Sequence, residues 1–298
     1  MTDSPIALGP FAAALPPAVY RLIDLALDED LGRGDVTTES IFDPADEARA
    51  VMLAKSELCL SGLDVAAAVF QRVDPRLRVE LLLADGARPR PGTEVLHVRG
   101  PVRALLSAER TALNFVQRLC GIATLARKYV DAVAGTGACI VDTRKTAPGF
   151  RFLDKRAVRH GGAGNHRADL GSGVLIKDNH VAAAGGVGAA IRRVKEQAPH
   201  TLRIECEVSA LPQIGEALAA GVDILLLDNF SPEKVREALA LLPEKGDPRR
   251  PLIEVSGGVN LSTVRAYAEA GADLISVGAL THSAAAADLS LEIVLCPA

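Results

Sequence analysis

Aromatic side chains are scarce in this sequence. Phe, Tyr and Trp together make up only 3% of the 298 residues, and tryptophan is absent. Proteins that bind single-stranded nucleic acid stack its bases on aromatic rings, so this composition argues against such binding. The 33 Lys and Arg residues against 37 Asp and Glu give a net charge of −4, which also argues against a protein that coats polyanions. We therefore expect no nucleic-acid partner.

Long apolar runs and paired cysteines are also missing. No apolar run reaches the ~18 residues that a membrane-spanning helix needs, so we expect no membrane partner. Residues 1–5 lack the basic and apolar segments of a secretory leader. The cysteines are scattered, odd in number and never in Cys-x-x-Cys spacing: Cys59, Cys120, Cys139, Cys206 and Cys296. This usage argues against a disulfide framework or structural zinc site and predicts a protein of the reducing cytoplasm.

The sequence does contain enough apolar residues for a large core. They make up 49% of the chain, and charged residues are spread along it, which excludes collagen-like and disordered classes. A chain of 298 residues allows one large barrel-type domain or two smaller domains.

One segment concentrates positive charge. Between Arg144 and Lys177 the net charge is +6, so the rest of the chain carries −10. A solvated face is the ordinary explanation of a basic run. Here Pro148-Gly149 and the glycines of 161–164 interrupt the run, which is typical of loops. Cationic side chains on glycine-rich loops favour a site for a small anion. The cations are Arg144, Lys145, Arg151, Lys155, Arg156, Arg159, Arg167 and Lys177.

The first hundred residues predict a small α/β layer with an open sheet. A helix over 22–30 ends at the turn of Gly32 to Asp35, and a second helix is expected over 63–73. Strands are expected over 48–56, 77–83 and 93–98.

A long helix over about 107–133 leads into a regular alternation of strands and helices. Helices are expected over 210–220, 232–242 and 262–270, and strands over 138–141, 173–176, 202–208, 224–227, 252–255 and 274–277. This alternation predicts parallel strands covered by helices, as in a (β/α) barrel with fewer than eight strands. A doubly wound open sheet is the alternative, but no Gly-x-Gly-x-x-Gly follows the first strand.

Polar residues follow these strands, where the active site of a parallel barrel lies. Glu205 and Glu207 are two apart on one strand and therefore share a face, and Asp228 ends the next strand. Glu207 with Asp228 could hold Mg²⁺ or ribose hydroxyls. For Glu205 alone, an ion pair with Lys177 or an arginine explains the residue equally well. Ser256-Gly257-Gly258 and Gly278 favour a phosphate site, since glycines allow backbone N–H groups to approach it.

Other candidates are cationic. Arg110, Arg144 and Arg167 can bind carboxylates in a bidentate fashion, and Lys145 and Lys177 suit phosphate or an oxyanion. His166 is either a core histidine with satisfied hydrogen bonds or a donor to substrate. No Ser/His/Asp or Cys/His arrangement can be assembled from the sequence, so covalent hydrolase chemistry is not indicated.

Taken together, these motifs resemble those of the quinolinate phosphoribosyltransferases, also called nicotinate-nucleotide pyrophosphorylases (carboxylating). The similarity runs in the family's order from Asp28 to Ser283. It rests on residues 29–35, 109–114, 142–149, 161–167, 175–180, 227–230, 256–258 and 277–282. Two departures are Ala163, where a glycine is usual, and Asp169-Leu170-Gly171-Ser172, where Gly-Leu-x-Asp is frequent.

The resemblance implies two α/β domains in each subunit of a homodimer, with higher assembly open. Residues 1–115 would form an N-terminal sandwich to which 283–298 return as a helix, and 116–282 an incomplete, TIM-barrel-like (β/α) barrel. Arg110 would reach the neighbouring subunit's quinolinate site. The quinolinate pocket would comprise Thr143, Arg144, Lys145, His166, Arg167 and Lys177, with Lys145 towards pyrophosphate. The 5-phosphate would lie on Ser256, Gly257, Gly258, Val277, Gly278 and Ala279, near His282.

The implied reaction transfers phosphoribosyl from phosphoribosyl pyrophosphate to quinolinate with decarboxylation. It gives nicotinate mononucleotide, CO₂ and pyrophosphate in de novo NAD biosynthesis, with Mg²⁺ as cofactor. Lys145, Lys177, Glu207 and Asp228 would be catalytic, and Glu207 and Asp228 would contact the ribose hydroxyls and Mg²⁺, directly or indirectly. The alternatives are a molybdate-transport-associated or nicotinate-using phosphoribosyltransferase, a Schiff-base aldolase using Lys177, and a non-catalytic sensor of a phosphate ligand.

Overall fold

The computed structural model describes residues 15–244 and 246–295. The start of the chain and Cys296 lie outside these ranges, so the expectations that depend on them are not addressed by the structure. Cys59, Cys120, Cys139 and Cys206 are free thiols. Within the described ranges, no helix has both the length and the apolar character needed to cross a bilayer.

The first domain is an antiparallel sheet with helices packed on one face. Its elements are α1 (Pro17–Leu31), α2 (Val36–Ile41), β1 (Glu47–Ala54), α3 (Leu63–Val73), β2 (Arg78–Leu81) and β3 (Glu94–Pro101). The expected strands and both expected helices are present, and Gly32 ends α1 at a positive φ of 47°. Ala48, Ala50 and Met52 alternate with more exposed residues along β1, so one face of the sheet lies against the helices.

The end of the chain returns to this sheet, but as a strand. Segment β10 (Leu289–Leu295) pairs antiparallel with β1, from Ala48 opposite Leu295 to Ala54 opposite Leu289, and gives the order β10-β1-β3-β2. The predicted helix is therefore wrong. Leu291 and Ile293 pack towards the core while Glu292 and Val294 are exposed, a period of two that suits a strand.

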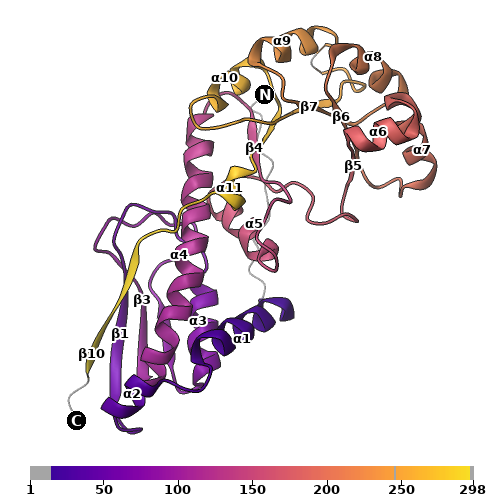
Figure 1. The fold of residues 1–298 in the computed structure, drawn as a ribbon. Coiled ribbons are helices and arrows are strands. Elements are labelled where there is room, and N and C mark those ends of the chain that lie inside the picture. The colour runs from indigo at the N-terminus through magenta and orange to yellow at the C-terminus, as the bar shows by residue number, and fades with distance from the viewer. Residues whose placement is uncertain (1–14, 245, 296–298) are drawn as a thin grey trace.

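Helix α4 (Val102–Ala132) joins the two domains (Figure 1). Its 31 residues make it about 46 Å long, so it reaches from the first sheet into the second domain. It starts earlier than expected, directly after β3. The expected boundary at residues 115 and 116 falls inside this helix, which therefore belongs to the cores of both domains.

The second domain is a curved parallel sheet with helices on its outer side (Figure 1). Its strands lie in the order β4-β9-β8-β7-β6-β5 and pair in parallel throughout. The first and last strands of this order, β4 and β5, do not pair with each other, which confirms the predicted incomplete barrel. The strands are β4 (Cys139–Val141), β5 (Val174–Ile176), β6 (Ile204–Val208), β7 (Ile224–Asp228), β8 (Leu252–Ser256) and β9 (Leu274–Ser276).

A helix follows each of these strands. The three predicted over 210–220, 232–242 and 262–270 are confirmed to within a few residues at their ends. The helices of this domain are α5 (Arg151–His160), α6 (Asp178–Ala184), α7 (Val187–Gln197), α8 (Leu211–Ala220), α9 (Pro232–Ala240), α10 (Val264–Ala270) and α11 (Ala279–His282).

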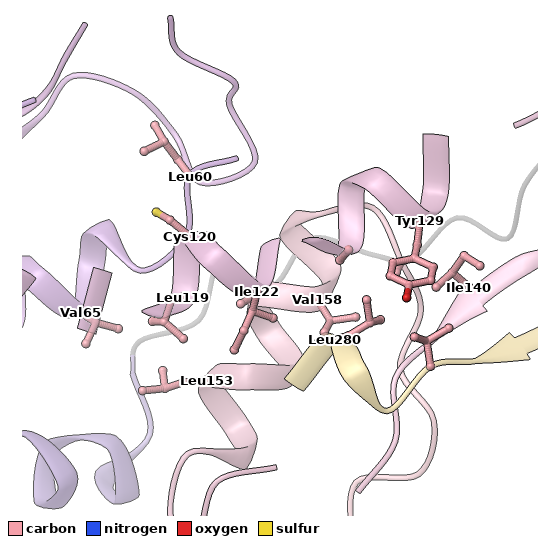
Figure 2. Close-up of a cluster of buried hydrophobic side chains, with 14 of the residues drawn as sticks. Leu60, Val65, Leu119, Cys120, Ile122, Tyr129, Ile140, Leu153, Val158 and Leu280 are labelled. Atoms are coloured by element: carbon pink, nitrogen blue, oxygen red, sulfur yellow. The ribbon is translucent and has the colours of Figure 1, made fainter. Parts of the chain in front are cut away.

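A continuous hydrophobic core connects the domains through α4 (Figure 2). Leu119 and Ile122 of α4 are buried with Val65 of α3 on one side and with Leu153 of α5 and Leu280 of α11 on the other. Burial of side chains from both domains around one helix positions the barrel relative to the first sheet.

Gly121 in α4 provides a test of this junction. A Cβ atom at Gly121 would lie 2.0 Å from the carbonyl oxygen of Ala285, in the segment that returns to the first sheet. We predict that Gly121→Ala lowers the free energy of unfolding by about 1–3 kcal/mol, because the returning backbone must move away. Urea unfolding measures the change.

Gly215→Ala is the matched control, since this glycine of α8 has no atom within 4 Å of the added Cβ. Alanine should leave the stability unchanged or raise it by up to about 1 kcal/mol, because it favours helix over glycine. Equal stability of Gly121→Ala and the native protein would contradict the close contact described above.

Candidate functional site

A cavity of about 310 Å³ opens at the carboxyl ends of the barrel strands. Most of the predicted pocket residues line it, and the cationic ones come from the loop after β4, from residues 166–167 and from the end of β5. The lining residues are Thr143, Arg144, Lys145, His166, Arg167, Leu175, Lys177, Glu207, Leu226, Asp228, Glu254, Ser256 and Ser276. The structure therefore brings together side chains that are more than 130 positions apart in the chain.

The acidic side of the cavity comes from the period-two geometry of neighbouring strands. Glu207 lies opposite Leu226 between β6 and β7, and Asp228 lies opposite Ser256 between β7 and β8. Burial raises the pKa of Glu207, and the carboxylates of Asp228 and Asp178 raise it further, against the effect of Lys177. Two carboxylates on neighbouring strands form a donor set that suits a divalent cation such as Mg²⁺.

The cationic side depends on a buried ion pair. Asp142, at the end of β4, has no exposed surface, and its Oδ1 lies 2.5 Å from Nζ of Lys155 on α5. The same carboxylate accepts hydrogen bonds from the backbone N–H of His166 at 2.8 Å and from Nδ2 of Asn165 at 2.7 Å. Lys155 Nζ also donates to the carbonyl oxygen of His166 at 2.9 Å. The His166 backbone is thus held at both its N–H and its C=O.

Burial disfavours the charged form of both residues, and each residue stabilises the charged form of the other. Burial raises the pKa of Asp142, and Lys155 and the hydrogen bonds oppose that rise. Burial likewise lowers the pKa of Lys155, and Asp142 opposes it. Because removal of either partner would leave an uncompensated buried charge, the pair fixes where residues 165–167 lie relative to Arg144 and Lys145.

His166 lies over a pair of buried carboxylates. Its Nε2 is 3.0 Å from Oε2 of Glu205 and 3.6 Å from Oε1 of Glu254. Its Nδ1 accepts a hydrogen bond from the backbone N–H of Arg167 at 2.7 Å. Burial lowers the pKa of His166, but the Glu205 hydrogen bond and both carboxylate charges outweigh it and raise the pKa. The Nδ1 hydrogen bond opposes full protonation, because a protonated Nδ1 could not accept.

These contacts settle two questions that the sequence left open. His166 lines the cavity, but both of its ring nitrogens are used within the protein, as in a satisfied core histidine. Glu205 pairs with His166 rather than with Lys177 or an arginine. Glu254 was missed in the sequence, although it lies two residues before Ser256 on the same strand and so faces the same side.

The glycine-rich ends of β8 and β9 lie at the same edge of the sheet. Gly257 has a φ of +91°, and a Cβ there would lie 2.2 Å from Oδ1 of Asn229, so only glycine fits. A Cβ on Gly278 would lie 3.1 Å both from Cδ of Lys145 and from Nε2 of His282. Of the residues predicted to bind phosphate, Ser256 lines the cavity itself, whereas the others adjoin it in the chain without lining it: Gly257, Gly258, Val277, Gly278, Ala279 and His282.

Arg110 is not part of this cavity. It is exposed in the first third of α4, and the cavity lining contains no residue of that helix. Its predicted role requires a second subunit.

The first domain and α5 bring together a serine, a histidine and an aspartate, which the sequence did not predict. Nδ1 of His160 is 2.9 Å from Oγ of Ser61 and 3.5 Å from Oδ2 of Asp85. A catalytic triad uses one ring nitrogen for the serine and the other for the carboxylate. Here one nitrogen faces both partners and Ser61 is buried, so the arrangement is structural.

Comparison with known proteins agrees with this geometry. Residues 35–120 match the family model for the N-terminal domain of quinolinate phosphoribosyl transferase, and residues 122–292 match the model for its C-terminal domain. The chain belongs to the quinolinate phosphoribosyltransferase family. The nicotinate-nucleotide pyrophosphorylase [carboxylating] of Mycobacterium leprae is 44% identical over 93% of this chain and 97% of its own length.

Other family members are similarly close. The human nicotinate-nucleotide pyrophosphorylase [carboxylating] is 38% identical over 95% of this chain and 94% of its own. The crystal structure of NadC from Streptococcus pyogenes superposes with a TM-score of 0.90 at 38% identity, covering 96% of this chain and all of that one. A human nicotinic acid phosphoribosyltransferase, at 13% identity and a TM-score of 0.58, shares the fold alone.

The two departures from the family pattern are accommodated locally. Ala163 is buried, and its N–H donates to the carbonyl oxygen of Val158 at 3.2 Å. Oδ1 of Asp169 accepts from the N–H groups of Gly171 and Ser172 at 2.9 and 2.8 Å, which closes a turn within the segment.

The buried ion pair carries a prediction for stability. Lys155→Met keeps the length of the side chain but leaves Asp142 buried without its cation. We predict a loss of about 3–5 kcal/mol in the free energy of unfolding, together with weaker substrate binding. Chemical denaturation and ligand titration measure the two effects.

Arg76→Met provides the comparison, because the Arg76–Asp74 pair is solvent-exposed on the arginine side and should contribute little. If Lys155→Met proved as stable as the native protein, the Asp142–Lys155 pair would not be what holds residues 165–167 in place.

Proposed function

We propose that this protein is a pentosyltransferase that transfers the phosphoribosyl group of phosphoribosyl pyrophosphate to quinolinate and decarboxylates the adduct. The products are nicotinate mononucleotide, CO₂ and pyrophosphate, as in NAD biosynthesis. The observation that carries the proposal is the cavity in which a cationic side faces a carboxylate pair, in a chain of this family.

The cationic side suits quinolinate. Its two carboxylates need planar, bidentate donors, which Arg144 and Arg167 supply, while Lys177 adds a point charge from the end of β5. Burial lowers the pKa of Arg167, and Arg144 lowers it further, so the two guanidinium groups repel each other without a ligand. A dianionic substrate would relieve that repulsion. Thr143 and His166 complete this side of the pocket.

The opposite side suits phosphoribosyl pyrophosphate. Lys145 lies beside Gly278 and His282, where pyrophosphate oxygens could meet the ammonium group. The 5-phosphate would bind at the turns after β8 and β9, formed by Ser256, Gly257, Gly258, Val277, Gly278 and Ala279. Backbone N–H groups at such glycine-rich turns bind phosphate.

The reaction centre would lie between these sides. Glu207 and Asp228 would hold the ribose hydroxyls and Mg²⁺, and they stabilise the positive charge that the sugar gains as pyrophosphate leaves. Mg²⁺, when bound, offsets the charge on the leaving group. Lys145 assists from the pyrophosphate side. In the second step the bond from C2 of the ring to its carboxylate breaks, and Lys177 lowers the energy of the electron pair left at C2.

We further propose a homodimer, with higher assembly possible, in which Arg110 of one subunit enters the partner's cavity. Arg110 is exposed, and no residue of its helix lines the cavity of its own subunit, which supports an intermolecular role. The scattered free cysteines support a cytoplasmic location.

The direct test measures nicotinate mononucleotide from quinolinate, phosphoribosyl pyrophosphate and Mg²⁺, with nicotinate as the control acceptor. We expect product from quinolinate only. Arg144→Ala should weaken quinolinate binding at least about 30-fold, the equivalent of about 2 kcal/mol for an unpaired charge contact. Arg249→Ala, remote from the cavity, should bind as the native protein does.

Absence of product from quinolinate, in a folded dimeric preparation, would contradict the proposed activity. Unchanged quinolinate affinity of Arg144→Ala would contradict the assigned role of that arginine.

Shared sites predict complementation between two inactive variants. In Arg110→Ala each subunit lacks the arginine that would enter the partner's cavity. In Lys177→Ala each subunit lacks a lysine of its own cavity. After equal amounts are mixed and subunits exchange, half of the dimers are hybrids with one intact site each, so activity should return to about a quarter of the native value. Steady-state assays before and after exchange measure this. Continued inactivity of a demonstrated hybrid would place Arg110 outside the partner's site.

A further inference from the structure

A second cavity lies behind the first. It has a volume of about 490 Å³ and is lined by residues at the amino-terminal ends of β5, β6, β7 and β9 and by the 165–173 loop. Its position follows from the incomplete barrel, because that loop occupies the region between the unpaired edge strands β4 and β5. His166, Arg167 and Glu254 border both cavities.

Glu254 is the carboxyl group at this boundary. Its side chain projects from the middle of β8 into the barrel and is 2% exposed. Its Oε1 has no hydrogen-bond partner among the described residues, and Nε2 of His166 lies 3.6 Å from it. A buried, unpartnered carboxyl oxygen that faces a substrate cavity is costly to maintain without a use.

The surroundings of Glu254 favour its protonated form. Burial and the neighbouring Glu205 carboxylate raise the pKa of Glu254 to about 7, against the effects of His166 and Ser276. Arg144, Arg167 and Lys177 face the same cavity from the other elements, and Lys155 lies behind His166. Near neutral pH a substantial share of the protein therefore holds a proton on this carboxyl.

The proposed reaction needs a proton at this end of the cavity. When the bond between C2 and its carboxylate breaks, CO₂ departs and the electron pair stays on C2. A proton must then form the new C–H bond. The arginines are too weakly acidic to supply it, and Glu207 and Asp228 are assigned to the ribose and the cation. A carboxylic acid is in general a much stronger acid than an alkylammonium group.

We propose that Glu254 is the general acid that protonates C2 of the ring, and that the second cavity gives solvent access to reload it. This inference rests on the proposed function. The proton moves from Glu254 to C2, and the resulting carboxylate takes one proton from solvent through the cavity behind it. The net step consumes one proton and the adduct and releases nicotinate mononucleotide and CO₂.

His166 and Glu205 act as positioning residues in this arrangement. The Nε2 of His166 lies between Glu205 and Glu254, and the Asp142–Lys155 pair holds its backbone. Glu205 borders only the second cavity, whereas Glu254 borders both. The two glutamates are therefore a matched pair in which one reaches the ring and the other does not.

The test compares Glu254→Gln with Glu205→Gln in the full dimeric protein. The reaction is run in equal parts H₂O and D₂O, with separate measurement of pyrophosphate release, nicotinate mononucleotide formation and the deuterium fraction at C2 of the product. Glu254→Gln should release pyrophosphate normally but form nicotinate mononucleotide at least about 100-fold more slowly, with an altered deuterium fraction. Glu205→Gln should keep the native deuterium fraction.

The inference is overturned if Glu254→Gln forms product at the native rate with the native deuterium fraction. If Glu254→Gln fails to fold, Glu254→Asp is measured instead, because its carboxyl group lies one methylene farther from the ring. This variant should form nicotinate mononucleotide more slowly but release pyrophosphate at the native rate. Native rates of both steps would refute the role. Failure of the proposed function is distinct, because the native protein would then form no nicotinate mononucleotide.

Discussion

The buried pair of Asp142 and Lys155 is the interaction on which the candidate site depends. It joins the end of β4 to α5 and fixes the backbone of His166 at two points. The barrel is open between β4 and β5, and the loop that spans them pairs with β4 at one bridge: the N–H of Gly164 donates to the carbonyl oxygen of Ile140 at 2.8 Å, and the N–H of Asp142 donates to that of Gly164 at 3.2 Å. The ion pair and its hydrogen bonds hold the residues that follow this bridge, and they place Arg167 next to Arg144 in spite of the repulsion between the two guanidinium groups.

Charge separation within one cavity is the second constraint. The loops after β4 and β5 carry the cationic side chains on one side of the cavity. The alternation of side chains along β6 and β7 places Glu207 and Asp228 on the other side. Among the described residues no ion pair joins the two sides, although Lys177 opposes the rise in the pKa of Glu207. The arrangement becomes favourable when a ligand with anionic ends and a developing cationic centre lies between them, which is the charge pattern of the proposed transition state.

The sequence predicted much of this and missed particular parts for physical reasons. Alternating strands and helices predicted the parallel barrel because short apolar or β-branched segments recur between helical segments, and glycine and charge patterns located the cavity residues. The strand character of 289–295 was missed because its pairing with β1 is a contact between opposite ends of the chain. Glu254 was missed because one acidic residue within an apolar strand does not reveal that its neighbours in space are Glu205 and His166.

A crystal structure of the protein with quinolinate bound tests the central claim most directly. The account predicts that the ring lies in the cavity of about 310 Å³, with its carboxylates on Arg144, Arg167 and Lys177 and its nitrogen towards Glu207 and Asp228. Quinolinate bound elsewhere, or an arginine pair that turns away from its carboxylates, would contradict the account.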